Sequence, residues 1–215
     1  MNIYSQISSN RTKTYLIIFF FIAFVSFFFF LLGKFSGNST SYFIFGLLFS
    51  VASGFFSYFY SDKMVLFMSG AKPADKRTYF DLFTVVENLS IAAGMPMPKV
   101  YIMEDPAPNA FATGRDPKHA VVCATTGILE RLDRQELEAV IAHELSHIKN
   151  YDILVMSVVS VLVGTIAFVA DWVMRSLFWG GLGGNDNNSR RNNQLFYFLF
   201  ILLLIISPIV ATLIQ

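Results

Sequence analysis

Charged residues are scarce in this chain, and they are unevenly placed. Asp, Glu, Lys and Arg make up 14% of the 215 residues, whereas soluble domains contain about 25%. Residues 14–32 and residues 41–60 contain no charged side chain at all. Because each run is long enough to cross a hydrocarbon core of about 30 Å, the composition excludes an ordinary soluble protein and indicates a multi-pass membrane protein.

Cysteine is almost absent as well, since Cys123 is the single one. One cysteine cannot form a disulfide within the chain, which is consistent with a reducing compartment. The net charge is +1 and no basic, aromatic-rich patch occurs, so we expect no nucleic acid partner. The first hydrophobic run lacks a small-residue cleavage site and a second run follows it, which indicates a retained anchor rather than a signal peptide.

Two membrane hairpins are expected to flank one polar domain. The three segments are residues 1–60, with spans at about 14–32 and 41–60, residues 61–152, and residues 153–215, with spans at about 153–171 and 195–214. Arg11 and Lys13 precede the first span and several lysines follow the second, so the positive-inside rule places the polar domain in the cytoplasm. Arg175, Arg190 and Arg191 in the late loop oppose that rule, so a late hairpin that does not cross fully remains an alternative.

The polar domain is predicted to be an α+β fold. Its expected elements are a helix at 78–93, a strand at 99–104, a hairpin of strands at 110–113 and 120–125, a short helix from Gly127 and a longer helix after Asp133. Asp133 and Glu136 have the spacing of a capping box at the start of the longer helix. His119 ends the hairpin turn, where a solvated residue is the expected role.

The longer helix carries the sequence His143-Glu144-Leu145-Ser146-His147, which reads H-E-x-x-H. On a helix the two histidines lie one turn apart, about 6 Å along the axis, and face the same way. Both imidazoles can then reach one zinc ion, and Glu144 can act as the general base on a water molecule. Asp152 could orient a histidine ring, or it could simply be a charge at the end of the helix. A chance match is the alternative for the whole pattern.

A catalytic zinc keeps three protein ligands and one water, whose pKa it lowers to about 7. Glu144 would take the proton of the attacking water and pass it to the leaving amine. The sequence therefore predicts metal-assisted peptide hydrolysis at the surface of the membrane.

Three runs together carry a resemblance to a known family. They are residues 109–115 (NAFATGR), 125–129 (TTGIL) and 136–147 (ELEAVIAHELSH), followed by Asn150 and Asp152. The chain resembles the HtpX family of bacterial membrane zinc endopeptidases over essentially its whole length. The resemblance implies an α-helical multi-pass membrane protein with an inserted zincin-like catalytic domain of the gluzincin type.

The same resemblance implies a function and a site. His143 and His147 would bind one Zn²⁺ per subunit, Glu144 would be catalytic, and the strand Asn109-Ala110-Phe111-Ala112-Thr113 would pair with the substrate backbone. The implied setting is the bacterial cytoplasmic (inner) membrane, with the catalytic domain in the cytoplasm. Damaged or misfolded membrane proteins are the implied substrates during stress, and other quality-control proteases are possible partners.

One feature departs from the family. Its third zinc ligand is a glutamate on a helix after the fourth span, whereas the acids after Asp152 are Asp171 and Asp186. Neither has the expected position. We therefore expect the third ligand to lie beyond Gln215 in a longer protein, and the 215 residues alone to bind zinc weakly and to be inactive.

Three other functions are weighed against this one. An intramembrane protease is disfavoured, because the motif helix begins with charged residues and ends in Lys149-Asn150. A transporter is disfavoured, because no span contains an ionisable residue in its interior. A catalytically inactive scaffold or adaptor with a degenerate zincin domain remains the alternative, since it would also lack a ligand.

Overall fold

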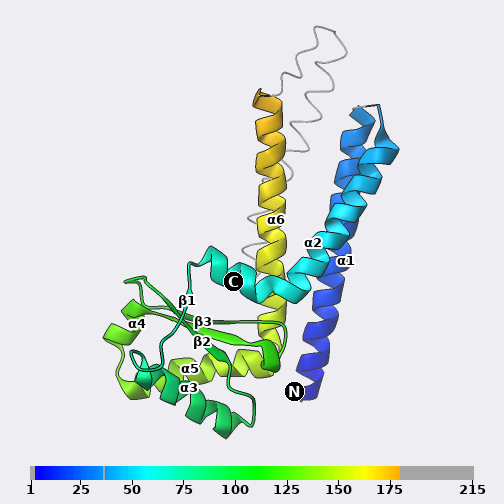
Figure 1. Cartoon of the computed structure of the whole chain (residues 1–215). Helices are drawn as coiled ribbons and strands as arrows, with labels where there is room; N and C mark the ends of the chain where they lie inside the picture. Colours follow the sequence, from blue (N-terminus) through cyan, green and yellow to red (C-terminus); the bar gives the residue numbers. More distant parts are fainter. Residues whose placement is uncertain (1–2, 36, 180–215) are drawn as a thin grey trace. The chain divides into compact units, whose positions relative to one another are not determined.

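The computed structural model of the chain describes residues 3–35 and 37–179 (Figure 1). These residues form two compact units. The first unit joins the start of the chain, up to Leu16, to residues Phe56–Val158. The second unit contains Ile17–Phe55 and the residues from Val159 onward. The first sixteen residues thus belong to the same unit as the polar domain.

Six α-helices, one 3₁₀ turn and four strands occur in the part of the chain that the structure describes. In order they are α1 (Ile3–Phe35), α2 (Ser39–Met68), β1 (Lys72–Pro73), α3 (Phe80–Ala93), β2 (Lys99–Met103), β3 (Ala110–Thr113), η1 (Pro117–His119), β4 (Val121–Thr125), α4 (Thr126–Arg131), α5 (Arg134–Lys149) and α6 (Asp152–Trp179). The predicted helices and strands of the polar domain are confirmed to within two residues, and the predicted α+β class is correct.

Three helices are long and apolar enough to cross a membrane among the residues described. They cover Ser5–Lys34, Ser39–Met68 and Asp152–Trp172. The first three predicted spans are therefore confirmed as helices, and all three helices are longer than expected. α2 continues past Tyr60 because no helix breaker occurs before Gly70, and α6 likewise continues past Trp172. The fourth predicted span, at 195–214, and most of the loop before it lie outside the described residues.

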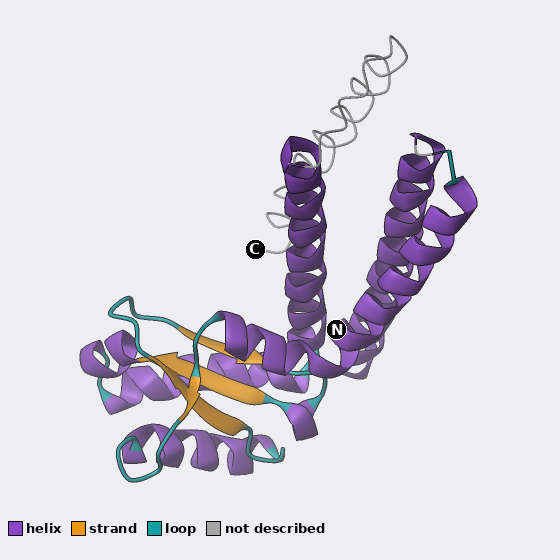
Figure 2. Cartoon of the chain, turned by 45° about the horizontal axis from the view of Figure 1, so that its top comes forward, coloured by secondary structure: helices purple, strands orange, loops and turns teal. Residues whose placement is uncertain are grey.

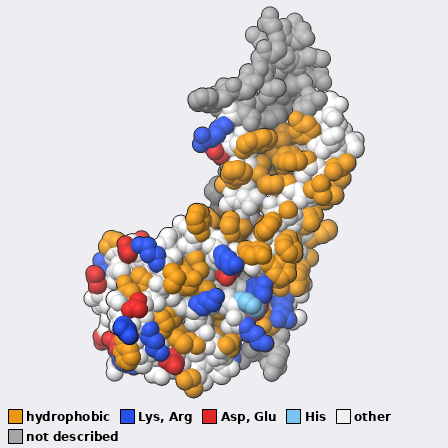
Figure 3. All heavy atoms as spheres, viewed as in Figure 1, with side chains coloured by type: hydrophobic (Ala, Val, Ile, Leu, Met, Phe, Trp, Pro, Cys, Tyr) orange, Lys and Arg blue, Asp and Glu red, His pale blue; other side chains and the backbone are white. Residues whose placement is uncertain are grey.

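Close helix packing characterises the second unit. Gly46 of α2 lies against the Phe29 side chain of α1, where an added Cβ would come within 2.5 Å of the Phe29 Cβ. The Phe29 ring meets Phe45 edge to face, and the hydroxyls of Ser26 and Ser50 lie 3.3 Å apart. Small residues and hydroxyl pairs of this kind allow helices to approach closely within a bilayer. The outer surface of these helices is mostly hydrophobic (Figure 3).

The first unit contains one four-stranded sheet of order β1-β2-β4-β3 (Figure 2). β2 and β4 run parallel, whereas β3 is antiparallel to β4 and β1 is antiparallel to β2. All five residues of β4 are buried, which fits a central strand with an apolar sequence. β3 is an edge strand. β1 was not predicted, because two residues that include a proline give no alternating pattern.

Two helices cover one face of this sheet. α3 and α5 lie side by side below the strands in Figure 1, and α5 also packs against β3. The core between them is built from apolar side chains, and its most buried members are Leu82, Val85, Val86, Val122, Ala124, Ile141, Ile148 and Ile153. α5 contributes Leu137, Ile141, Leu145 and Ile148, which recur every three or four residues. This buried stripe fixes which way the remaining side chains of α5 point.

Candidate metal centre

The start of α5 is held by a reciprocal capping arrangement. The Asp133 carboxylate accepts a hydrogen bond from the backbone N–H of Glu136 at 2.9 Å. The Glu136 carboxylate in turn accepts the backbone N–H of Asp133 at 3.0 Å. This is the predicted capping box, and it satisfies two donors that the helix itself cannot pair. The cap and the buried stripe together set the register of the H-E-x-x-H residues.

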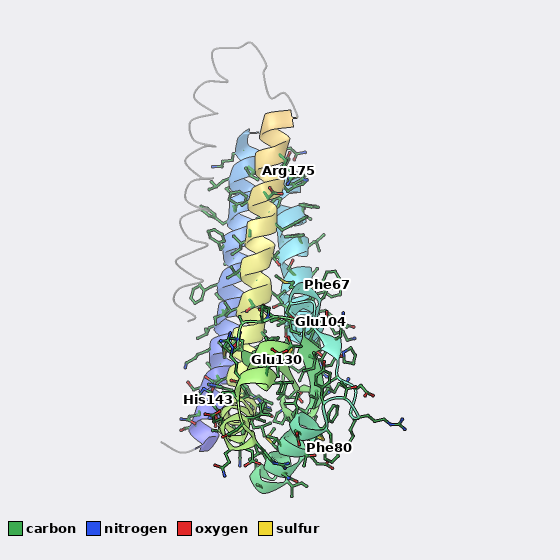
Figure 4. All side chains as sticks on the ribbon, turned by 90° about the vertical axis from the view of Figure 1, so that its left-hand side faces the viewer. Phe67, Phe80, Glu104, Glu130, His143 and Arg175 are labelled. Carbon is green, nitrogen blue, oxygen red and sulfur yellow. The ribbon has the colours of Figure 1, made fainter. Side chains whose placement is uncertain are left out.

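The two histidines of α5 converge on each other. The Nε2 atoms of His143 and His147 lie 3.1 Å apart, and the ring planes are inclined at 85°. His143 is exposed on α5 (Figure 4), and about a third of the His147 side chain is exposed. Two imidazole nitrogens therefore meet at a point that solvent can reach.

Asp152 contacts the other nitrogen of His147. Asp152 Oδ2 lies 3.0 Å from His147 Nδ1. Because a carboxylate can only accept a hydrogen bond, Nδ1 carries the hydrogen and Nε2 keeps its lone pair. That lone pair is the one aimed toward His143. The geometry is that of a carboxylate that orients a ligand histidine.

Glu144 lies between the histidine pair and β3. Partial burial raises the pKa of the Glu144 carboxyl above its ordinary value, against the opposing influence of His147 and His143. The backbone N–H of Ala112 acts in the same lowering direction on the pKa of this carboxyl. The candidate base is therefore partly buried and feels both histidines and the edge strand.

The direction of the β3 backbone groups follows from one contact. The Asn109 carbonyl accepts the Thr125 N–H at 2.9 Å, so Asn109 faces β4. Backbone groups alternate in direction along a strand. Phe111 and Thr113 therefore also face β4, whereas the N–H and C=O groups of Ala110 and Ala112 face the outer edge. The lowering influence of the Ala112 N–H on the pKa of the Glu144 carboxyl agrees with this assignment.

Both ends of β3 are anchored. At the start, the Asn109 N–H donates to the Thr125 hydroxyl at 2.9 Å. At the end, the Thr113 hydroxyl lies 2.7 Å from the Ser157 hydroxyl, and both side chains are buried. The predicted substrate strand, residues 109–113, is therefore rigid, although regular pairing begins only at Ala110.

The residues present fit zinc in part. Two nitrogens that bind one tetrahedral ion at about 2.05 Å lie about 3.3 Å apart, and the observed separation of 3.1 Å is close to that. Imidazole is also a common zinc ligand. Within residues 3–35 and 37–179, no group of three His, Cys, Asp or Glu side chains is arranged to hold a metal. The structure thus supplies a two-histidine site, and the third protein ligand stays a prediction.

His119 lies apart from this centre. Its Nδ1 is 2.8 Å from Asp116 Oδ1, its Nε2 is 3.0 Å from Arg115 Nη2, and half of its side chain is exposed. Sequence reasoning did not identify Asn10, whose amide donates a hydrogen bond to Asp152. No sequence pattern could have revealed it, because the two residues are 142 positions apart.

Comparison with known proteins gives two consistent results. Residues 77–214 match the family model described as peptidase family M48. The chain is also 50% identical over 177 residues to a protein named Protease HtpX homolog from Tropheryma whipplei strain Twist, which covers 82% of this chain and 60% of the relative. A protein of the same name from Caldanaerobacter subterraneus subsp. tengcongensis is 45% identical over 179 residues, or 83% of this chain and 60% of the relative. The chain spans about 60% of the length of these curated relatives.

Proposed function

The chain belongs to peptidase family M48, and on that premise we propose that it is the membrane-bound catalytic part of a zinc-dependent endopeptidase. The observation that carries the proposal is the convergence of two histidine nitrogens next to a partly buried glutamate on α5. Its apolar helices make it a membrane protein. The resemblance to the HtpX family supports a bacterial cytoplasmic membrane, with the catalytic unit facing the cytoplasm.

His143 and His147 would hold the ion through their Nε2 atoms. Asp152 keeps the His147 ring in the tautomer that leaves Nε2 unprotonated, so that the nitrogen can act as a donor to a metal. When bound, zinc supplies a Lewis acid that makes water more acidic and polarises a carbonyl group. A glutamate from outside the described residues is proposed as the third protein ligand.

Glu144 is proposed as the general base. Its partial burial raises the pKa of the carboxyl, which makes the carboxylate a stronger proton acceptor than one in bulk water. It takes the proton of the attacking water and later gives it to the amine that leaves. The Ala112 N–H lowers the pKa of the same carboxyl, which agrees with a carboxylate at the edge of the sheet, close to the peptide that is cleaved.

β3 is proposed to bind the substrate backbone. The outward N–H and C=O groups of Ala110 can pair with an extended peptide, which adds a strand to the sheet. Such pairing recognises the substrate backbone and few of its side chains, so it suits a protease that acts on many unfolded segments. Damaged or misfolded membrane proteins at the cytoplasmic face are therefore the proposed substrate class, within membrane protein quality control under stress.

The decisive experiment replaces the proposed base. In the protein with its proposed third zinc ligand present, Glu144→Gln should lower cleavage of casein, and of a model membrane protein with an unfolded cytoplasmic segment, by about 10²–10⁴-fold. Glu138→Gln is the matched control, because Glu138 lies on the same helix and pairs with Arg134 in solvent. If Glu144→Gln cleaves both substrates at the wild-type rate, the hydrolase proposal fails and an inactive scaffold becomes the better account.

A further inference from the structure

Asn10 is a buried polar residue near the start of α1. Only 7% of this residue is exposed. It lies a few positions before the first apolar run of α1. A buried amide needs partners for its donors. Asn10 Nδ2 donates to the carbonyl of Asn150 at 3.0 Å and to Asp152 Oδ1. Both acceptors belong to the short junction between α5 and α6.

The two oxygens of Asp152 have different partners. Oδ1 accepts from Asn10, and Oδ2 accepts from Nδ1 of His147 at 3.0 Å. A carboxylate held at both oxygens cannot rotate without losing one of these hydrogen bonds. The amide of Asn10 therefore fixes the orientation in which Asp152 meets His147.

The junction itself has an uncommon backbone. Tyr151 adopts a φ of +62°, which is rare for a residue other than glycine. The Arg11 guanidinium lies over the Tyr151 ring, 4.6 Å from its centroid. Two consecutive residues of α1 thus contact three consecutive residues of the junction. All of them belong to the first compact unit.

We propose that Asn10 is a positioning residue of the metal centre, which acts through Asp152 to hold His147 in its metal-binding orientation and tautomer. The start of the first membrane helix then forms part of the catalytic unit and is not only an anchor. This inference rests on the proposed metal site. A purely structural role for Asn10, as a buried contact between α1 and the junction, is the competing explanation.

The first test needs no metal. The chain has three histidines, so ¹⁵N-histidine spectra can be assigned by removing His119 or His143 in turn. At about pH 8, where imidazole in peptides is neutral, wild-type His147 should show a protonated Nδ1 and an unprotonated Nε2. Asn10→Leu keeps the branched shape and the number of side-chain heavy atoms but removes the donor. In this variant Asp152 no longer holds the His147 ring in one tautomer, so the ¹⁵N signals of His147 should shift toward the average of the two exchanging tautomers.

A matched control separates orientation from packing. Ser57→Ala removes another buried hydrogen bond of the first unit, from the Ser57 hydroxyl to the Val158 carbonyl at 3.0 Å, and has no contact with Asp152. It should leave the His147 signals unchanged. The inference is overturned if Asn10→Leu leaves those signals at their wild-type values, or if Ser57→Ala shifts them equally.

The second test is a double-mutant cycle on zinc affinity, measured by competition with a chelator in the protein with its proposed third ligand present. Removing an acceptor that orients a ligand lowers metal affinity by about 10–100-fold, so Asp152→Ala should fall in that range. Asn10→Leu acts one step further away and should cost about 3–10-fold. In the Asp152→Ala background it should cost less than about twofold, because its route to His147 is gone.

An equal loss in both backgrounds would show that Asn10 acts through packing alone and would overturn the inference. A protein that contains the proposed third ligand and still binds no zinc would contradict the proposed function instead. In that case the His147 signals of the metal-free protein still decide the role of Asn10. The two failures are therefore distinguishable.

Discussion

The Nε2 atoms of His143 and His147 lie 3.1 Å apart on the exposed side of α5. Neither residue belongs to the apolar stripe of that helix, so packing does not require them to meet. His147 is further constrained by Asp152, which occupies its Nδ1. The spacing of four residues on α5 brings both nitrogens to one point, and in the proposed function that point is where zinc would bind.

The capping box of α5 should contribute measurably to stability. Asp133→Ala removes the acceptor of the Glu136 N–H, and such a loss costs about 1 kcal/mol. We expect a lower thermal unfolding midpoint of the purified protein, with Glu130→Ala at the end of α4 as the control. Equal midpoints for Asp133→Ala and the wild type would show that the cap is dispensable.

Ser157 should matter more than its partner Thr113. Ser157→Ala leaves the buried Thr113 hydroxyl and the buried Gly114 N–H without the Ser157 hydroxyl as hydrogen-bond partner. Each unsatisfied group costs about 1–3 kcal/mol. Thr113→Val removes a hydroxyl but leaves Ser157 in contact with Gly114, so its unfolding midpoint should fall less. The reverse order would contradict the anchoring of β3 through Ser157.

The outward backbone of Ala110 should bind substrate. Ala110→Pro removes an N–H that faces the outer edge and leaves the hydrogen bonds of Phe111 to β4 in place. We expect the KM for an unfolded protein substrate to rise about 10-fold, with a smaller change in kcat, because an N–H to substrate is lost in both the bound state and the transition state. An unchanged KM, in a variant with normal thermal unfolding, would argue against strand addition at β3.

Cys123 should be inert in the folded protein. It is fully buried on β4, and burial raises the pKa of its thiol to about 11. The thiolate is the reactive form, so iodoacetamide at about pH 8 should label the native protein very slowly and the denatured protein completely. Rapid labelling of the native protein would contradict the placement of β4 at the centre of the sheet.

The raised pKa of the Cys123 thiol also predicts how the stability of the protein changes with pH. Between the ordinary thiol pKa of 9.0 and the folded value of about 11, the unfolded state releases a proton that the folded state keeps. The contribution of Cys123 to stability is therefore complete below pH 9.0 and falls as the pH rises toward 11. Cys123→Ala should remove this part of the pH dependence.

Local patterns predicted most of the fold and the central part of the site. Asp133 and Glu136 are three residues apart, and His143 and His147 are four apart, so a helix brings each pair together by itself. β3 and β4 were predicted because one short turn joins them. β1 was missed, because its two residues form a strand only by pairing with Ile102 and Tyr101 of β2.

Long-range contacts could not be predicted in this way. Asn10 and Asp152 are 142 residues apart, and neither stands in a pattern that refers to the other. For the same reason, the sequence does not decide whether Asp152 orients a histidine ring or is simply a charge at the end of the helix. The contact with His147 depends on the sharp junction at Tyr151. A tyrosine in the sequence does not predict the positive φ that this residue adopts.

The most direct test of the account is the zinc affinity of histidine variants, measured by competition with a chelator in the protein with its proposed third ligand present. His143→Ala and His147→Ala should each weaken zinc binding by about 100-fold or more, since each removes a ligand. His119→Ala is the matched control, because His119 pairs with Asp116 within the turn between β3 and β4 and its removal should leave the affinity unchanged. Wild-type affinity in the double variant of His143 and His147 would contradict the central claim.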